Sequence, residues 1–175
     1  MAGFVASKEF TNLCATYGIK PGTIEIKKPV VEEEITYIPS DGQQMYNYLR
    51  RLGYSKAVAC GILGNMWSES NFLPYADSGY YYGLCQWGST RRTNLFNWCY
   101  ANGYDPTTVL GQMHFMDYEL KTYYGWVYQQ LLTVQDSAQG ASDAAWYFVR
   151  GYEGASIDGG RVGLAAQYYN MYAND

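Results

Sequence analysis

The sequence predicts an all-α domain with an extended N-terminal arm. Three observations support this: apolar residues recur at helical spacing after residue 40, no alternating strand pairs of useful length occur there, and prolines interrupt the segment before it. The chain has 175 residues, 48% of them hydrophobic, which is enough to bury one well-packed core. We therefore expect an arm or linker over residues 1–40 and one helical domain over residues 41–175.

The arm differs from the rest of the chain. Residues 24–26 and 29–31 read as extended, and Pro21, Pro29 and Pro39 break any helix. Three consecutive glutamates at positions 32–34 form a short acidic run, which is usually solvated surface. We expect this arm to pack on the main domain or to link it to something upstream.

The body reads as a series of helices with identifiable ends. Asp41 can cap a first helix, whose apolar residues follow the i, i+3, i+4, i+7 spacing and which Gly53 stops. A loop rich in Gly, Tyr and Ser is expected over residues 70–88. The other helices are expected over residues 55–68, 89–103, 105–120, 142–149 and 161–172.

The segment 55–68 is predicted to be a buried core helix, because its apolar residues cover nearly every face. Gly61 and Gly64 each cost about 1 kcal/mol against Ala inside a helix, so we expect them to permit close helix packing. Pro74 and the polar pair at positions 70–71 end the run. Glu69 therefore lies near the C-terminus of this helix.

Glu69 is the candidate general acid. The helix dipole is negative at this end and disfavours a carboxylate, and partial burial disfavours the charged form as well. Both effects are expected to raise the pKa of Glu69, which suits an acid that must hold a proton near neutral pH. A surface-facing glutamate in the last helical turn fits the spacing equally well, so the pattern alone leaves both interpretations open.

Composition points to sugars rather than to nucleic acid or metal. The net charge is −4 with scattered basic residues, which argues against a nucleic-acid partner, whereas 20 tyrosines and five tryptophans suit stacking on sugar rings as well as core packing. His114 is the only histidine, so no multi-His metal site is possible, and we expect neither metal nor cofactor. The start lacks a signal-peptide core and no apolar run approaches a membrane span, so we expect a soluble chain made in the cytoplasm.

The four cysteines lie at positions 14, 60, 85 and 99 and lack metal-ligand spacing. Free thiols in the core are the default, with a disulfide left open. A Cys85–His114 dyad has no supporting motif.

A set of short motifs runs through the helical body in a fixed order. They are Gly64-Asn65-x-x-x-Glu69-Ser70, Tyr82-Gly83-Leu84-Cys85-Gln86-Trp87, Arg91 or Arg92, Gln112-x-x-Phe115-x-x-x-Glu119-Leu120, and Gly151-Tyr152-Glu153. In this order and spacing they resemble the signature of phage tail lysozymes, which are virion-associated domains that degrade peptidoglycan. The resemblance covers about residues 41–169.

A second pattern overlaps the first. Glu69-Ser70-x-Phe72-x-Pro74-x-Ala76-x-Ser78, with Gly83-Leu84-x-Gln86 downstream, is similar to that of soluble lytic transglycosylases and goose-type lysozymes. Both resemblances imply a lysozyme-like catalytic domain over residues 41–175, in which a catalytic Glu closes a buried helix. Trp87 stands where transglycosylases continue with a Met-Pro type of sequence, which favours the phage lysozymes.

The resemblance implies that Glu69 protonates the glycosidic oxygen of the β-1,4 bond between N-acetylmuramic acid and N-acetylglucosamine. Asp77, in the loop expected to border the cleft, is predicted as the second catalytic group that positions or deprotonates a water. Its alternative role is to cap the loop. Glu153 is the other candidate, unless it holds its own loop through an arginine, and Glu119 is expected to form a structural ion pair.

The remaining site predictions concern substrate contacts. Ser78 and Gln86 match positions that touch substrate or support the acid in the resembling families, and the Gly-Tyr-Glu motif adds Tyr152 and Glu153. Tyr82 and Trp87 are candidates for stacking on sugar rings, with packing beneath the loop as the alternative. Arg91 and Arg92 are candidates for binding peptide-stem or lactyl carboxylates, with a solvated surface position as the alternative.

Two other functions stay open at this stage. A lytic transglycosylase would use the same Glu69 and leave 1,6-anhydro-muramyl ends, and a non-catalytic glycan-binding tail module would need no acid. The resemblance implies peptidoglycan glycan strands as the main partner, other phage tail proteins as further partners, and a place in the virion tail or release from the host cytoplasm.

Overall fold

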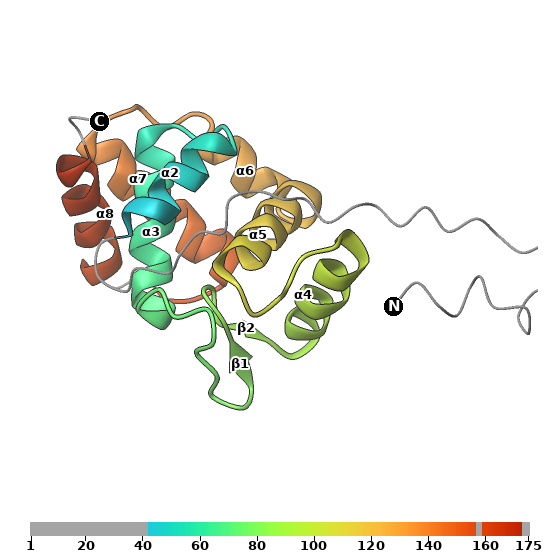
Figure 1. The fold of residues 1–175 in the computed structure, drawn as a ribbon. Coiled ribbons are helices and arrows are strands. Elements are labelled where there is room, and N and C mark those ends of the chain that lie inside the picture. Colours follow the sequence, from blue (N-terminus) through green and yellow to red (C-terminus); the bar gives the residue numbers. More distant parts are fainter. Residues whose placement is uncertain (1–41, 157–158, 173–175) are drawn as a thin grey trace, which may run out of the picture.

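The computed structural model describes residues 42–156 and 159–172, and over these it is helical apart from one small hairpin (Figure 1). The prediction of an all-α domain is confirmed. The predicted arm over residues 1–40 lies outside the described residues. In chain order the elements are α2 (Gln43–Arg51), α3 (Lys56–Ser70), β1 (Tyr81–Tyr82), β2 (Trp87–Gly88), α4 (Ser89–Asn102), α5 (Val109–Tyr123), α6 (Gly125–Leu131), α7 (Ala138–Phe148), the π-helix η1 (Val149–Glu153) and α8 (Gly159–Met171).

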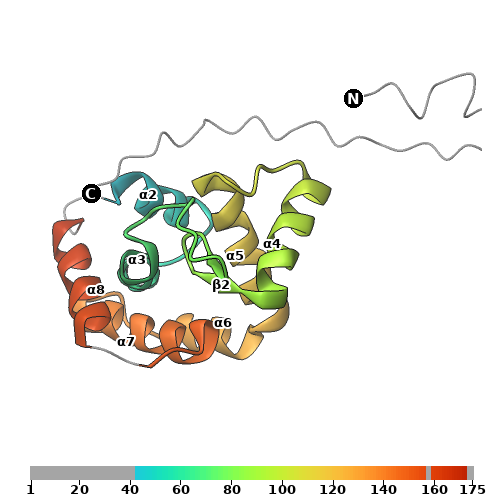
Figure 2. The same cartoon turned by 90° about the horizontal axis from the view of Figure 1, so that it is seen from below.

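Helix α3 is the centre of the body. Figure 2 views it nearly end-on, with α2, α7 and α8 arranged around it. Every residue from Ala57 to Met66 is buried, which confirms the prediction of a core helix. Ser55 caps its start by accepting a hydrogen bond from the Val58 N–H, and Asn71 ends it in the left-handed conformation.

Two glycines set how closely the neighbouring helices approach α3. A Cβ atom at Gly61 would lie 2.6 Å from the Ala144 Cβ of α7, and one at Gly64 would lie 2.7 Å from the Arg161 carbonyl oxygen of α8. Both distances are shorter than real Cβ contacts. The expectation that these glycines permit close packing is confirmed.

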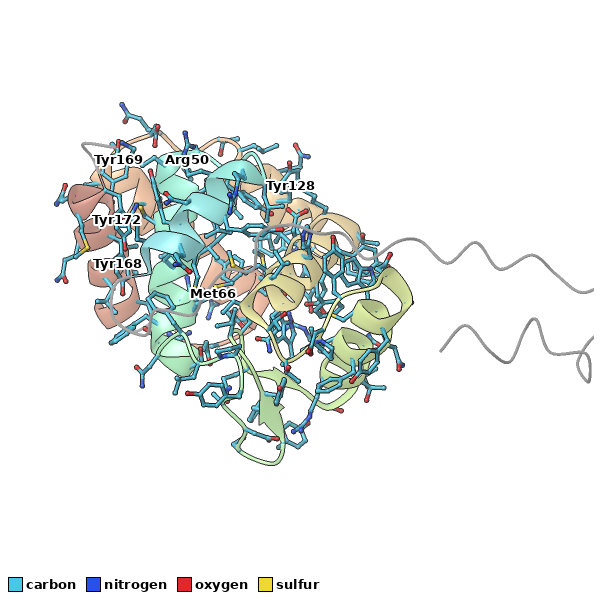
Figure 3. All side chains as sticks on the ribbon, in the orientation of Figure 1. Arg50, Met66, Tyr128, Tyr168, Tyr169 and Tyr172 are labelled. Atoms are coloured by element: carbon cyan, nitrogen blue, oxygen red, sulfur yellow. The ribbon has the colours of Figure 1, made fainter. Side chains whose placement is uncertain are left out.

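Tyrosines close the core beside α8. Tyr172 stacks on Tyr46 with ring centroids 4.6 Å apart, and it runs parallel to Tyr168 at 6.0 Å (Figure 3). All three rings are buried. These tyrosines are therefore core residues, in line with the expectation that many rings pack rather than bind.

Helix boundaries differ from the predictions at three places. Helix α5 begins after Thr108, whose hydroxyl accepts a hydrogen bond from the Gly111 N–H, because Asp105 instead closes a turn with Thr107. Helix α7 begins after Ser137 rather than at residue 142, since the Ser137 hydroxyl caps it. The sequence did not predict α6, a seven-residue helix that buries only Val127 and Leu131.

The segment predicted as a loop over residues 70–88 contains a hairpin. Tyr81 pairs with Gly88 and Tyr82 with Trp87, so each strand is too short to give an alternating pattern in the sequence. The buried Gln112 of α5 supports this segment: its Oε1 accepts a hydrogen bond from the Leu84 N–H at 2.8 Å, and its Nε2 donates to the Pro74 carbonyl at 2.6 Å. Figure 1 shows the hairpin beyond the C-terminal end of α3, beside α4.

The described cysteines and the histidine have structural surroundings. Cys60, Cys85 and Cys99 are free and buried, and Cys14 lies outside the described residues. His114 stacks on Tyr104 with centroids 4.3 Å apart and hydrogen-bonds the Tyr48 hydroxyl, whereas the Cys85 thiol bonds a carboxylate elsewhere. The two side chains that formed the hypothetical dyad therefore have different partners.

The described residues contain neither a cluster suited to a metal ion nor a helix suited to a membrane. Across residues 42–156 and 159–172, no group of three or more His, Cys, Asp or Glu side chains is arranged to hold a metal ion. Within the same ranges, no helix has the length and apolar character needed to cross a membrane.

Candidate active site

A cavity of about 530 Å³ opens where the C-terminal end of α3 meets the hairpin, η1 and the start of α8. Its lining is mixed, with two carboxyl groups, two guanidinium groups and two tyrosine rings. The lining residues are Glu69, Tyr80, Tyr81, Cys85, Gln86, Gly88, Ser89, Arg91, Glu153, Gly154, Ala155 and Arg161.

Glu69 enters this cavity from the last turn of α3. Its side chain is 16% exposed, so it is partly buried as predicted and the surface-facing alternative does not describe it. The carboxylate forms an ion pair with Arg161 of α8, whose side chain is 12% exposed. Because the Arg161 backbone rests on Gly64, one turn and a half before Glu69, the same helix places both partners.

Glu153 enters the same cavity from the end of η1. The wide turn of this π-helix continues α7, and Gly154 ends it with a φ of 67°. Gly151 lets η1 lie close to α6, since a Cβ there would be 2.4 Å from Val127 Cγ2. The Oε1 atom of Glu153 is shielded from solvent and, within the described part of the chain, has no hydrogen-bond partner.

Burial raises the pKa of Glu153 from its ordinary value of 4.5 to about 8, and the nearby negative charge of Glu69 adds to this shift. Three smaller effects lower this pKa: the positive charge of Arg91, a hydrogen bond from the Cys85 thiol and the positive charge of Arg161. At neutral pH most Glu153 side chains therefore hold a proton.

Gln86 and Arg91 are further predicted residues that line the cavity. Gln86 lies in the turn of the hairpin. Its backbone has a φ of 45°, and its amide nitrogen donates to the Gly83 carbonyl at 2.9 Å. This bond braces the hairpin turn and leaves Gln86 at the cavity wall.

Asp77 and Ser78 lie outside the cavity lining. The Asp77 carboxylate accepts two hydrogen bonds from Arg92, at 2.9 and 2.8 Å, and a third from the Gly79 N–H. Arg92 holds the pKa of Asp77 below its usual value. Asp77 is thus engaged with Arg92 and the Ser78 hydroxyl with Tyr81, which is the arrangement that the loop-capping alternative describes.

Trp87 and Tyr152 lie beneath the cavity rather than in it. Trp87 is 0% exposed and donates its indole N–H to Glu119 Oε2 at 3.0 Å, and the buried Tyr152 hydroxyl donates to the same oxygen at 2.7 Å. Arg91 completes this cluster with two hydrogen bonds to Glu119, at 2.9 and 2.8 Å. The predicted ion pair of Glu119 is confirmed, and Arg91 is its partner rather than a free ligand for carboxylates.

The prediction that Trp87 stacks on sugar is corrected, because a ring with no exposed surface has no face to offer. The same reason removes Tyr152 as a direct substrate contact. Tyr82 is also buried, with its ring against Phe96 at 5.2 Å and the Arg92 guanidinium over it at 4.9 Å. For all three rings the packing alternative describes the structure.

Tyr80 and Tyr81 are the aromatic residues of the cavity wall, and sequence reasoning did not single them out. They are 58% and 49% exposed. Strand β1 has only two residues, an exposed Tyr81 and a buried Tyr82. The sequence could have indicated which tyrosines are exposed only through this alternation, which is too short to recognise.

The sequence is similar to known phage proteins. The sequence model of a family described as phage tail lysozyme matches residues 41–172. Morphogenesis protein 1 of Bacillus phage B103 is 28% identical over 123 residues, which cover 65% of this chain and 33% of that protein. The chain thus spans about a third of the length of this relative.

Proposed function

This chain belongs to the phage tail lysozyme family, and on that premise we propose that it is a muramidase, which hydrolyses the β-1,4 bond between N-acetylmuramic acid and N-acetylglucosamine. Membership implies peptidoglycan-lytic activity in a phage-associated protein that acts on the cell wall. The finer assignment of bond and mechanism is our proposal.

The observation that supports it is a pair of carboxyl groups in one cavity, Glu69 from α3 and Glu153 from η1. Hydrolysis of a glycosidic bond commonly uses two carboxyl groups, one of which must be protonated while the other is ionised. The two environments differ in the required sense. Glu69 is ion-paired with Arg161, whereas burial raises the pKa of Glu153 to about 8.

In this proposal Glu69 is the group that reaches the glycosidic oxygen, because it faces the cavity from the end of α3, whereas Glu153 Oε1 is shielded from solvent. The bound glycan displaces Arg161 from Glu69, and the proton held by Glu153 then passes to Glu69. Glu69 donates this proton to the glycosidic oxygen as its bond to the sugar breaks, and the Glu153 carboxylate accepts a proton from the attacking water. The pair thus ends the turnover with the one proton it began with, on Glu153.

The test compares turbidity loss of purified cell walls for three variants. Glu69→Gln is expected to lose at least about 100-fold in rate, the usual share of a general acid, with its melting temperature nearly unchanged. Wild-type activity is expected to decline above about pH 8, where Glu153 loses its proton, and Glu153→Gln is expected to lose part of the rate and to show no such decline. Asp143→Asn, an exposed carboxylate of α7, is the matched control and is expected to behave like wild type.

Two outcomes would change the assignment. Full lysis by Glu69→Gln would remove Glu69 as the acid. Loss of lysis only in Glu153→Gln would transfer that role to Glu153.

Product analysis separates the proposal from a lytic transglycosylase. A muramidase adds water and leaves reducing muramic acid ends, whereas a transglycosylase leaves 1,6-anhydro ends that are lighter by one water. Mass spectrometry of digested peptidoglycan distinguishes them, and anhydro ends alone would overturn the hydrolase. A wild-type protein that binds walls without clearing them would favour a glycan-binding module.

The relative from Bacillus phage B103 supports a proposal for the site of action. Morphogenesis protein 1 is by its name a protein of phage assembly, and it shares only part of its length with this chain. We propose that the chain works in the virion tail, in contact with other tail proteins, and cuts host peptidoglycan from there.

A further inference from the structure

Two tyrosine rings form one side of the cavity and remain largely in water. Tyr80 and Tyr81 contact each other edge to face, with centroids 4.7 Å apart and an interplanar angle of 76°. We propose that this pair is the sugar-stacking wall of the cleft and that the ion pair of Asp77 with Arg92 holds the wall in position. The inference rests on a glycan substrate, as in the proposed function.

The rings are seated on the backbone of the hairpin. A Cβ atom at Gly88 would lie 2.7 Å from Tyr81 Cε1 and 2.9 Å from Tyr80 Cε1, so the glycine lets both rings lie close to the backbone of β2. Tyr81 and Gly88 are also cross-strand partners. Because the rings already have this support in the free protein, little ordering is left for the moment of binding.

The turn that carries the rings is tied to α4. Arg92 in the first turn of α4 binds the Asp77 carboxylate with two hydrogen bonds and donates a third, at 3.1 Å, to the Gly79 carbonyl. The Ser78 hydroxyl accepts the Tyr81 N–H at 3.0 Å. An ion pair this exposed contributes little to global stability, so its effect is on the position of the turn.

The chemistry of the cavity matches a glycan better than a peptide. Tyrosine offers a flat apolar face for the C–H face of a sugar and a hydroxyl for its polar edge. The same cavity holds Glu69, Glu153 and Arg161, which can bond hydroxyl and acetamido groups. We therefore assign the wall to the N-acetylated hexoses of the glycan strand rather than to the peptide stem.

Binding is measured in the Glu69→Gln background, where no turnover interferes. The probe is a peptide-free tetrasaccharide of alternating N-acetylglucosamine and N-acetylmuramic acid, titrated by calorimetry. Tyr80→Ala and Tyr81→Ala are each expected to weaken Kd by about 2- to 10-fold, the usual worth of one aromatic contact, and the Phe variants to restore most of it. Tyr100→Ala, which removes an exposed ring of α4 outside the cavity lining, is the matched control.

The kinetic constants of the same variants with Glu69 intact distinguish a loss of sugar stacking from a general loss of structure. Tyr80→Ala and Tyr81→Ala are expected to raise KM with kcat within about twofold, because stacking binds ground state and transition state alike. Asp77→Asn and Arg92→Met are expected to raise KM in the same way and more weakly, with an unchanged melting temperature. If the Tyr80 and Tyr81 variants have the same Kd and KM as the Tyr100 variant, the proposed stacking role of Tyr80 and Tyr81 is wrong.

The outcomes also distinguish this inference from the proposed function. If the wild-type protein never lyses cell walls but binds the tetrasaccharide through Tyr80 and Tyr81, the muramidase proposal is wrong and the stacking role of the two tyrosines is supported. If lysis requires Glu69 but does not depend on either tyrosine, the muramidase proposal is supported and the stacking role is wrong. Competition by a free stem peptide, but not by the tetrasaccharide, would identify a peptide as the occupant and overturn the assignment.

Discussion

At the scale of single residues, Glu153 links the stability of the fold to pH. Its pKa rises from 4.5 to about 8 on folding, so between these values the folded chain holds a proton that the unfolded chain has released. The contribution of Glu153 to the free energy of unfolding is therefore complete below about pH 4.5. It is lost as the pH rises through about 8.

Replacing Glu153 with Gln tests this directly, since the amide is neutral at every pH. The melting temperature of Glu153→Gln minus that of wild type is expected to increase from pH 5 to pH 9, because only the wild type must bury a charge at high pH. Circular dichroism melts across that range measure the difference. A difference that stays constant with pH would contradict the raised pKa.

The cluster around Glu119 gives a second prediction for a single residue. Glu119 is nearly fully buried and receives hydrogen bonds from Trp87, Tyr152 and Arg91. Glu119→Gln leaves the partly buried Arg91 without its counter-charge, which is expected to cost about 3 kcal/mol in the free energy of unfolding. Urea unfolding measures this loss. Asp143→Asn on exposed α7 surface serves as control, with an expected change below about 0.5 kcal/mol.

At the scale of elements, the approach of α7 to α3 depends on Gly61. Gly61→Ala gains helix propensity of about 1 kcal/mol but drives a methyl group into Ala144, so we expect a net loss of about 1–3 kcal/mol. Gly163→Ala in α8 is the matched control, because a Cβ there meets nothing within 4 Å and the propensity gain remains. Denaturant unfolding of both variants should give opposite signs. Stabilisation by both substitutions would contradict the close packing.

The sequence predicted the buried helix α3 and the partial burial of Glu69 at its end, for a physical reason. A helix buried on all sides must be apolar on all sides, so the pattern is local and visible. The π-helix was not visible, because its wide turn depends on Gly151 meeting Val127 of α6, a contact distant in sequence.

The candidate site was partly predictable in the same sense. Glu153 was named as one option for the second carboxyl group, but its raised pKa needs burial and the charge of Glu69, which only the fold brings together. The ion pair of Asp77 was not predicted, because Arg92, which binds it, is one of two adjacent arginines with different partners. Tyr80 and Tyr81 were missed because they stand next to a third tyrosine, Tyr82, and the sequence does not indicate which of the three is buried.

At the scale of the whole molecule, the described helices share a single core. Its buried residues run from Met45 in α2 to Tyr172 after α8 and include members of all the helices between. We therefore expect a chain of residues 41–175 to fold cooperatively and to lyse walls at a rate within about twofold of that of the 175-residue chain. Thermal melts and turbidity assays on both chains test this. A broad melt or lost lysis in the shorter chain would show that residues 1–40 belong to the domain.

The central place of α3 has a consequence for when the protein becomes active. A helix with no polar face is not stable in water by itself, so α3 is fixed only after α2, α7 and α8 have assembled around it. Glu69 stands at its end, and its partner Arg161 arrives with α8. On the proposed mechanism, partly folded chains therefore lack a working acid, and we expect no attack on a wall before α8 has docked.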